Sequence, residues 1–187
     1  MFDTKKKTAF EALKVKLGLE NVMQAPRVQK VIVSVGTGST NDKNKVKLIE
    51  DRITKITGQK PVVNKARKSI ATFKLREGDA VGFQATLRGP RMSEFLDKLI
   101  HIALPRTKDF RGINNTIIDD MGNATIGIKE NSIFPENGEE ELRDIFGFAV
   151  TIVTTAKTKT EARKFFETIG IPFAKIVEGD KKKKKKK

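Results

Sequence analysis

The sequence of 187 residues contains no cysteine, no tryptophan and no tyrosine, and it has a single histidine. Without cysteine there can be no disulfide framework, thiol nucleophile or cysteine-ligated metal site. The one histidine, His101, lies in an apolar stretch of helical character and has no second histidine with which to hold a metal. We expect His101 to have a packing or surface role, and we expect no metal and no cofactor.

Long hydrophobic runs are absent as well. No apolar stretch approaches the roughly 18 residues that a membrane span requires. The start of the chain carries Lys5, Lys6 and Lys7 but lacks the apolar core and the small-residue cleavage site of a signal peptide. These features predict a soluble intracellular protein.

Positive charge, by contrast, is abundant and unevenly distributed. The chain holds 38 Lys and Arg against 23 Asp and Glu, a net charge of +15, and the last seven residues, Lys181 to Lys187, are all lysine. Residues 60–91 carry eight basic and two acidic residues, a net charge of +6, whereas residues 136–144 carry five acidic residues and one Arg. Such a basic excess predicts a polyanionic partner, either nucleic acid or an acidic membrane surface.

The hydrophobic pattern alternates between strand and helix periods. Helices are expected from Phe10 to Gly18, from Asn41 or Asp42 to Gly58, from Gly89 to Pro105, and from the capping box at Thr158 and Glu161 to Gly170. Strands are expected over residues 27–35, 61–63, 80–88, 116–119, 124–129 and 148–155.

This order of elements predicts an α+β fold. We expect two layers, with helices packed on one face of a largely antiparallel sheet. Residues 65–79 show no sustained periodicity and contain five Lys or Arg, so they are interpreted as a long, protruding basic loop. A single domain is expected over residues 1–178, followed by a disordered lysine-rich tail at residues 179–187.

Catalytic sites are weakly indicated. The glycine turn Gly36–Asn41 lies between a strand and a helix, but it lacks the third glycine of a dinucleotide loop and the Gly-Lys-Ser/Thr triplet of an ATP loop. Asp119 and Asp120 are adjacent acids of the kind that usually face solvent. We therefore predict that the chain is not an enzyme.

The predicted basic loop has the composition of a nucleic-acid contact. Lysine and arginine neutralise phosphates, hydroxyls such as those of Ser69 and Thr72 bond phosphate or ribose, and an exposed Phe73 could stack on a base. Phe73 could equally anchor the loop on the core. The missing Tyr and Trp disfavour a stacking platform, and a rigid body with a charged loop suits the shape of folded RNA.

Seven short strings, in order along the chain, are similar to those of a known family. They are residues 56–62, 65–70, 73–78, 86–89, 103–106, 109–112 and 152–157. From about Asn21 to Phe173 the chain resembles the bacterial large-subunit ribosomal protein number five, the family that binds 5S ribosomal RNA. The resemblance implies a structural role in translation, in the central protuberance of the large subunit of the cytoplasmic ribosome.

The resemblance also implies particular contacts. The residues expected to bind 5S rRNA are Ser34, Gln59 and Thr86, together with Lys30 and Arg88. Relatives usually have Asn where this chain has Ser34, and a hydroxyl cannot span the same two-sided contact. The loop expected to contact P-site tRNA contributes Arg67, Lys68, Ser69, Thr72, Phe73 and Lys74. A bridge to a basic protein of the small-subunit head is expected to use Arg111, Glu139, Glu140 and Glu141.

The family's remaining partners would be 23S-type large-subunit rRNA and neighbouring large-subunit proteins, with no membrane. Two other functions are compatible with parts of the sequence. A free-standing basic RNA chaperone or translation regulator would use the same loop away from the ribosome. An enzyme with a phosphate-bearing ligand would use Gly36–Asn41.

Overall fold

The computed structural model describes residues 10–14, 16–38, 43–108, 110–137 and 145–174. The described residues form an α+β fold built on one five-stranded sheet, so the predicted fold class is confirmed. The expected tail at residues 179–187 and the expected helix cap at Asn41 or Asp42 lie outside the described residues.

The sheet is antiparallel throughout, with the strand order β2-β3-β1-β5-β4. Its strands are β1 (Val28–Gly36), β2 (Val62–Lys65), β3 (Ala80–Leu87), β4 (Ala124–Ile128) and β5 (Phe148–Thr154). The first strand lies at the centre, between β3 and β5, which come much later in the chain. Segments distant in sequence therefore meet on a single surface.

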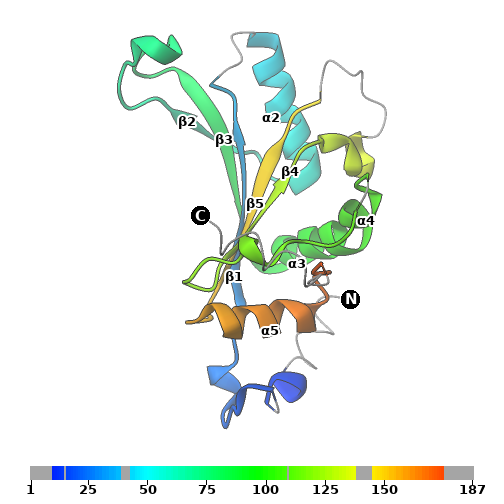
Figure 1. The fold of residues 1–187 in the computed structure, drawn as a ribbon. Coiled ribbons are helices and arrows are strands. Elements are labelled where there is room, and N and C mark those ends of the chain that lie inside the picture. The colour runs from blue at the N-terminus through cyan, green and yellow to red at the C-terminus, as the bar shows by residue number, and fades with distance from the viewer. Residues whose placement is uncertain (1–9, 15, 39–42, 109, 138–144, 175–187) are drawn as a thin grey trace, which may run out of the picture.

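The helices include α2 (Lys43–Thr57), α3 (Gly89–Lys98), α4 (Leu104–Arg106) and α5 (Lys159–Ile169). In Figure 1, α2, α3 and α4 lie to one side of the strands, and α5 crosses their lower end. Over the described residues, α2, α3 and α4 thus leave the opposite face of the sheet uncovered. The burial of alternate residues agrees with this arrangement. Val31, Val33 and Val35 of β1 are buried, whereas Lys30, Ile32 and Ser34 between them remain partly exposed.

Phenylalanine rings fill much of the core between sheet and helices. The rings of Phe95 on α3 and Phe134 are stacked, with centroids 6.0 Å apart. Phe134 also meets Phe148 of β5, with centroids 5.7 Å apart and ring planes tilted by 44°. These contacts join α3, the segment after β4 and the start of β5 into one hydrophobic cluster.

Several local predictions are confirmed. Helical spacing predicts that Val46, Ile49, Ile53 and Ile56 of α2 face inward; the three isoleucines are buried, and Val46 is partly buried against the core. The side chain of Thr158 caps α5 by accepting from the Glu161 N–H at 3.3 Å, and Gly170 ends that helix in the left-handed region with φ 102°.

One expected strand and one expected helix end are wrong. Residues 116–119 do not form a strand, because the Asn114 side chain accepts from the Thr116 N–H and starts a 3-10 turn over Asn115–Ile117. Ile118 alone bridges to Ala124. The helix after β3 continues past Pro105 to Arg106 through a π-helical turn at Leu99–Ala103, and Pro105 sits at the start of the following helical segment, where a missing N–H is tolerated.

Candidate nucleic-acid interface

The uncovered side of the sheet is the first candidate interface, and we call it the open face. It consists of the residues of β1, β3, β4 and β5 that alternate with buried ones, together with the β2 residues that pair with this side of β3: Lys30, Ile32, Ser34, Val62, Asn64, Gln84, Thr86, Thr125, Gly127, Ala149, Thr151 and Val153. Among these described residues only Lys30 carries a charge. The open face is therefore polar and nearly neutral.

The register brings most of the predicted 5S rRNA-binding residues together on this face. Ser34 pairs across the strands with Gln84, and Thr86 pairs with Ile32. Gln59, which precedes β2, reaches the same edge, since its Nε2 donates to the backbone oxygen of Thr86 at 3.4 Å. Residues from three separate segments, β1, β3 and the residues before β2, thus border one patch. Lys30 of β1, two residues before Ile32, belongs to the same patch.

Arg88 lies at the end of this patch. It follows β3 as the N-cap residue of α3, makes no side-chain cap hydrogen bond and is exposed. Its guanidinium can therefore bind a ligand without breaking a hydrogen bond that caps α3.

The sequence analysis missed two polar residues of the open face. The Asn64 Nδ2 donates to the Gln84 Oε1 at 3.4 Å, and Gln84 lies directly opposite Ser34. The signal for Gln84 was available in the strand pattern, because Gln84 and Thr86 alternate with the buried residues Phe83, Ala85 and Leu87. Asn64 gave no such signal, since every residue of β2 is exposed.

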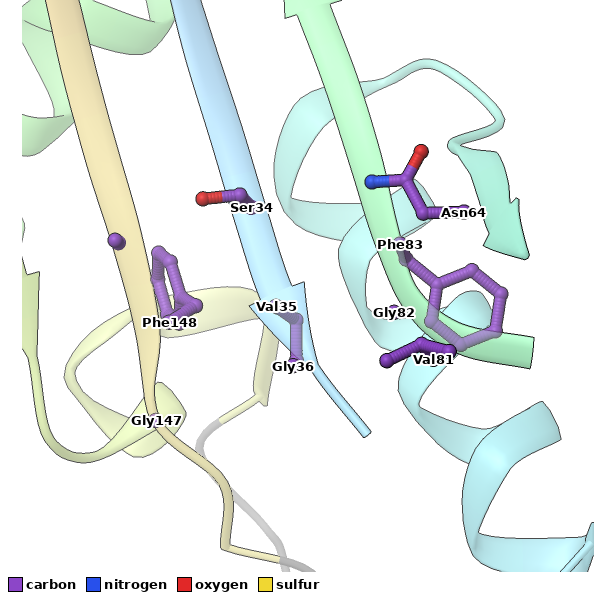
Figure 2. Close-up of a pocket in the computed structure, with 10 residues that line it drawn as sticks. Ser34, Val35, Gly36, Asn64, Val81, Gly82, Phe83, Gly147 and Phe148 are labelled. Atoms are coloured by element: carbon purple, nitrogen blue, oxygen red, sulfur yellow. The ribbon is translucent and has the colours of Figure 1, made fainter. Parts of the chain in front are cut away.

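A shallow depression of about 490 Å³ lies at one end of the open face. Figure 2 shows Ser34 and Asn64 at this depression, on separate strands, near the glycine positions Gly36 and Gly82. A Cβ at Gly82 would meet the Val35 backbone oxygen at 2.4 Å, so glycine is required for the close approach of β1 and β3. Gly36 and Gly82 thus place no side chain beside Ser34 and Asn64 at this depression.

The second candidate interface is the segment from the last residue of β2 to the start of β3, residues 65–79, which we call the basic loop. The expected contact residues Arg67, Lys68, Ser69, Thr72, Phe73 and Lys74 are all exposed. Phe73 is 65% exposed, which rules out the alternative that it anchors the loop on the core. In Figure 1 this segment lies at the far end of the β2–β3 pair, away from α5.

The basic loop has an internal order that its sequence did not reveal. Ile70 and Leu75 exchange both backbone hydrogen bonds, at 3.0 and 3.2 Å, around a 3-10 turn over Ala71–Phe73. The Ser69 hydroxyl accepts from the Glu77 N–H at 3.0 Å, and the Asp79 carboxylate accepts from the Arg76 N–H at 2.8 Å. Backbone bonds thus fix the loop while its cationic side chains stay in solvent.

The residues expected to form the small-subunit bridge are only partly described. Arg111 is exposed, whereas Glu139, Glu140 and Glu141 lie outside the described residues. The acid just before them, Glu136, pairs with Lys98 of α3, and Lys98 also donates to the Ile56 backbone oxygen at 3.4 Å. This ion pair links the start of the acidic segment to the helical layer.

The other sites weighed from sequence gain no support. The described residues contain no group of three or more His, Cys, Asp and Glu side chains that could hold a metal ion. The Nδ1 of His101 lies 3.0 Å from the Asp97 backbone oxygen one turn earlier, which matches the expected packing or surface role. Residues 39–42 of the glycine turn are outside the described part. Over the described ranges, no helix is long and apolar enough to span a membrane.

Comparisons with known proteins agree with this arrangement. A family model described as ribosomal protein L5 matches residues 21–76, and a second model, described as the C-terminus of the same ribosomal family, matches residues 80–173. The chain is 49% identical over 160 residues to the large ribosomal subunit protein uL5 of Mesoplasma florum, covering 85% of this chain and 89% of that protein. It is 46% identical over 170 residues to that of a Thermoanaerobacter species, covering 90% and 95%. The first matched segment contributes β1 and β2 to the sheet, and the second contributes β3, β4 and β5.

Proposed function

The chain belongs to the ribosomal protein L5 family, and from this premise we propose that it binds 5S rRNA in the central protuberance of the large subunit of the cytoplasmic ribosome. We also propose that the basic loop contacts P-site tRNA and that the region around Arg111 helps to bridge to the small-subunit head. The family is structural, so the function is to position RNA and involves no bond chemistry.

One observation carries the proposed 5S rRNA site. Ser34, Gln84 and Thr86 lie close together on the sheet face opposite α2, α3 and α4, where each side chain is partly exposed in the described structure. Hydroxyl and amide groups both donate and accept hydrogen bonds, and they can therefore contact ribose hydroxyls and base edges. Lys30 and Arg88 stand at the same end of β1 and β3 and supply the positive charge for nearby phosphates.

The basic loop supports the proposed tRNA contact in a different way. Its cations and the 65% exposed ring of Phe73 project from a segment that is fixed by its own hydrogen bonds. Arg67, Lys68 and Lys74 would neutralise phosphates, Ser69 and Thr72 would bond ribose or phosphate, and Phe73 would stack on a base or sugar. The loop would thus act as a preformed arm that reaches beyond the sheet.

The remaining partners follow from the rest of the surface. Exposed cations outside the two interfaces would meet 23S-type rRNA, and neighbouring large-subunit proteins would cover the other edges. The bridge would pair Arg111 and the acidic residues Glu139, Glu140 and Glu141 with a basic protein of the small-subunit head.

The salt dependence of binding tests the 5S rRNA site. The purified full chain should bind 5S rRNA through about five phosphate contacts, two from Lys30 and Arg88 and the rest from exposed cations outside the open face. Log K should then fall against log salt with a slope of roughly −3.5 to −4.5. Filter binding between low and moderate salt measures this slope. No binding, or a slope near zero, would remove the proposal.

The alternative function is a free-standing basic RNA chaperone or translation regulator. The exposed basic loop is the feature that favours it, because the same cations could bind RNA away from the ribosome. Sedimentation of cell extracts at moderate salt separates the two functions. A subunit component should sediment with large subunits, whereas a free chaperone should stay in the light fractions.

A further inference from the structure

We propose that the RNA site of the open face extends across β5 and β4, where Thr151 and Thr125 bind ribose hydroxyls of the same RNA. This inference rests on the proposed 5S rRNA function. It adds β4 and β5 to the site, and neither strand contains a residue that the sequence analysis expected to bind 5S rRNA.

The register places both threonines in line with the first half of the site. Ile32 of β1 pairs with Thr86 on one side and with Thr151 on the other, and Thr151 pairs with Thr125 of β4. The flanking residues Val150, Ile152, Ala124 and Ile126 are all buried. Because successive side chains on a strand point to opposite faces, the two threonines lie on the open face with Thr86.

The hydroxyls of Thr125 and Thr151 retain hydrogen-bonding capacity for a ligand. The Thr125 Oγ1 and the Thr151 Oγ1 are 3.1 Å apart, so one donates to the other. A hydroxyl has one donor and two acceptor positions, and this single bond leaves one donor and several acceptor positions unused. Thr125 is exposed and Thr151 is partly exposed, so these unused positions can meet a ligand hydroxyl, which both donates and accepts.

The neighbouring residues allow a close approach. The next row of the open face contains Ala149 of β5, which pairs with Ser34 on one side and with Gly127 on the other. Neither residue has a side chain long enough to hold a ligand away from the threonines. An added Cβ at Gly127 would meet nothing within 4 Å, so this row is open above the backbone.

The size and the charge of the face favour the ribose side of an RNA helix as the occupant. Thr86 and Thr125 are three strands apart, which is about 14–15 Å at the usual strand spacing. The shallow minor groove of A-form RNA is wide and displays its 2′-hydroxyls, whereas the minor groove of B-form DNA is about 6 Å wide and lacks them. Neutral hydroxyls can exchange hydrogen bonds with the 2′-hydroxyls of such a groove, whereas a row of phosphates would require cations.

The test replaces both hydroxyls with methyl groups of similar shape. The double variant Thr125→Val and Thr151→Val should bind 5S rRNA about 5- to 30-fold more weakly, through the loss of about two hydrogen bonds. Its salt slope should equal that of the unchanged protein, because hydroxyls release no counterions. In 2′-hydroxyl acylation footprinting, a few nucleotides protected by the unchanged protein should regain reactivity, while the others stay protected.

Two further variants serve as controls. Thr116→Val alters an exposed threonine outside the sheet and should leave affinity and footprint unchanged. The double variant Thr125→Ser and Thr151→Ser retains both hydroxyls and should restore most of the affinity. Far-ultraviolet circular dichroism and a thermal midpoint confirm that each variant is folded, and valine is favourable on a half-exposed strand.

The outcomes separate this inference from the function on which it rests. If the unchanged chain does not bind 5S rRNA, the proposed function itself is wrong. If it binds and the valine variant shows the same affinity and the same footprint, the extension to β4 and β5 is wrong. A valine variant that loses affinity with a reduced salt slope would also contradict it, because the lost contacts would then be phosphate contacts.

Discussion

At the scale of the residue, Phe134 joins the helical layer to the sheet through contacts with two other aromatic rings. It is fully buried, stacks on Phe95 and meets Phe148. Phe134→Ala should lower the free energy of unfolding by about 3–5 kcal/mol, because it removes buried apolar surface and leaves a cavity between α3 and β5. Urea unfolding followed by circular dichroism measures the change, since the chain has no Trp for fluorescence.

The matched control for this prediction is Phe73→Ala, because Phe73 is 65% exposed in the basic loop. An exposed ring contributes little to folding, so this variant should change stability by less than about 0.5 kcal/mol. Similar losses from the two variants would contradict the assignment of Phe134 to the core and of Phe73 to the surface.

Lys74 allows charge and backbone conformation to be separated in the basic loop. It is the one non-glycine residue with a positive φ, 53°, among the described residues. Asn tolerates this left-handed region, so Lys74→Asn should keep the loop conformation and remove one charge. We expect the salt slope for tRNA binding to become shallower by about 0.9, with 5S rRNA binding unchanged. An unchanged slope would mean that Lys74 does not contact a phosphate.

At the scale of the element, the close approach of β1 and β3 depends on glycine. A Cβ at Gly82 would lie 2.4 Å from the Val35 backbone oxygen, whereas a Cβ at Gly36, its cross-strand partner, would meet nothing within 4 Å. Gly82→Ala should therefore destabilise the protein by about 1–3 kcal/mol, through forced separation of the strands. Gly36→Ala should be neutral or stabilising by up to about 1 kcal/mol. Thermal unfolding of the two variants under one buffer compares them, and equal effects would show that the strands are not constrained at Gly82.

The elements also show how far the sequence can predict the structure. Helix spacing identified Ile49, Ile53 and Ile56 as core residues, and the pattern at Thr158 and Glu161 located the start of α5, because these signals are local. The 3-10 turn at Asn115–Ile117 escaped prediction because it depends on one hydrogen bond, which the Thr116 N–H donates to the Asn114 side chain. A β-branched run such as residues 116–118 favours a strand by composition alone.

The composition of the candidate site was harder to predict than its existence. Ser34, Gln59 and Thr86 were expected through a family resemblance, and the structure brings them to one patch. Gln84, Thr125 and Thr151 alternate with buried residues, which indicates the face on which each lies, but only the strand pairing brings them together with Asn64. The alternation in a strand gives the face of a residue, whereas its cross-strand neighbours depend on which distant strands pair in the whole fold.

At the scale of the whole molecule, the two candidate interfaces differ in charge: the open face is nearly neutral and the basic loop is strongly positive. The open face has one cation among its described residues, whereas the basic loop exposes Arg67, Lys68 and Lys74. The net charge of +15 therefore overstates the charge at the sheet. Two surfaces of such different character should bind different RNA features, the loop through phosphates and the sheet through hydroxyls and base edges.

The most direct test of this division compares two variants with two RNAs. The face variant carries Ser34→Ala and Thr86→Val, and the loop variant carries Arg67→Ala, Lys68→Ala and Lys74→Ala. Dissociation constants for 5S rRNA and for tRNA are measured at one salt concentration, after circular dichroism has confirmed folding. The face variant should bind 5S rRNA at least about tenfold more weakly and keep its affinity for tRNA. The loop variant should lose affinity for tRNA and keep its affinity for 5S rRNA. Equal losses for both RNAs, or loss of 5S rRNA binding from the loop variant alone, would contradict the division.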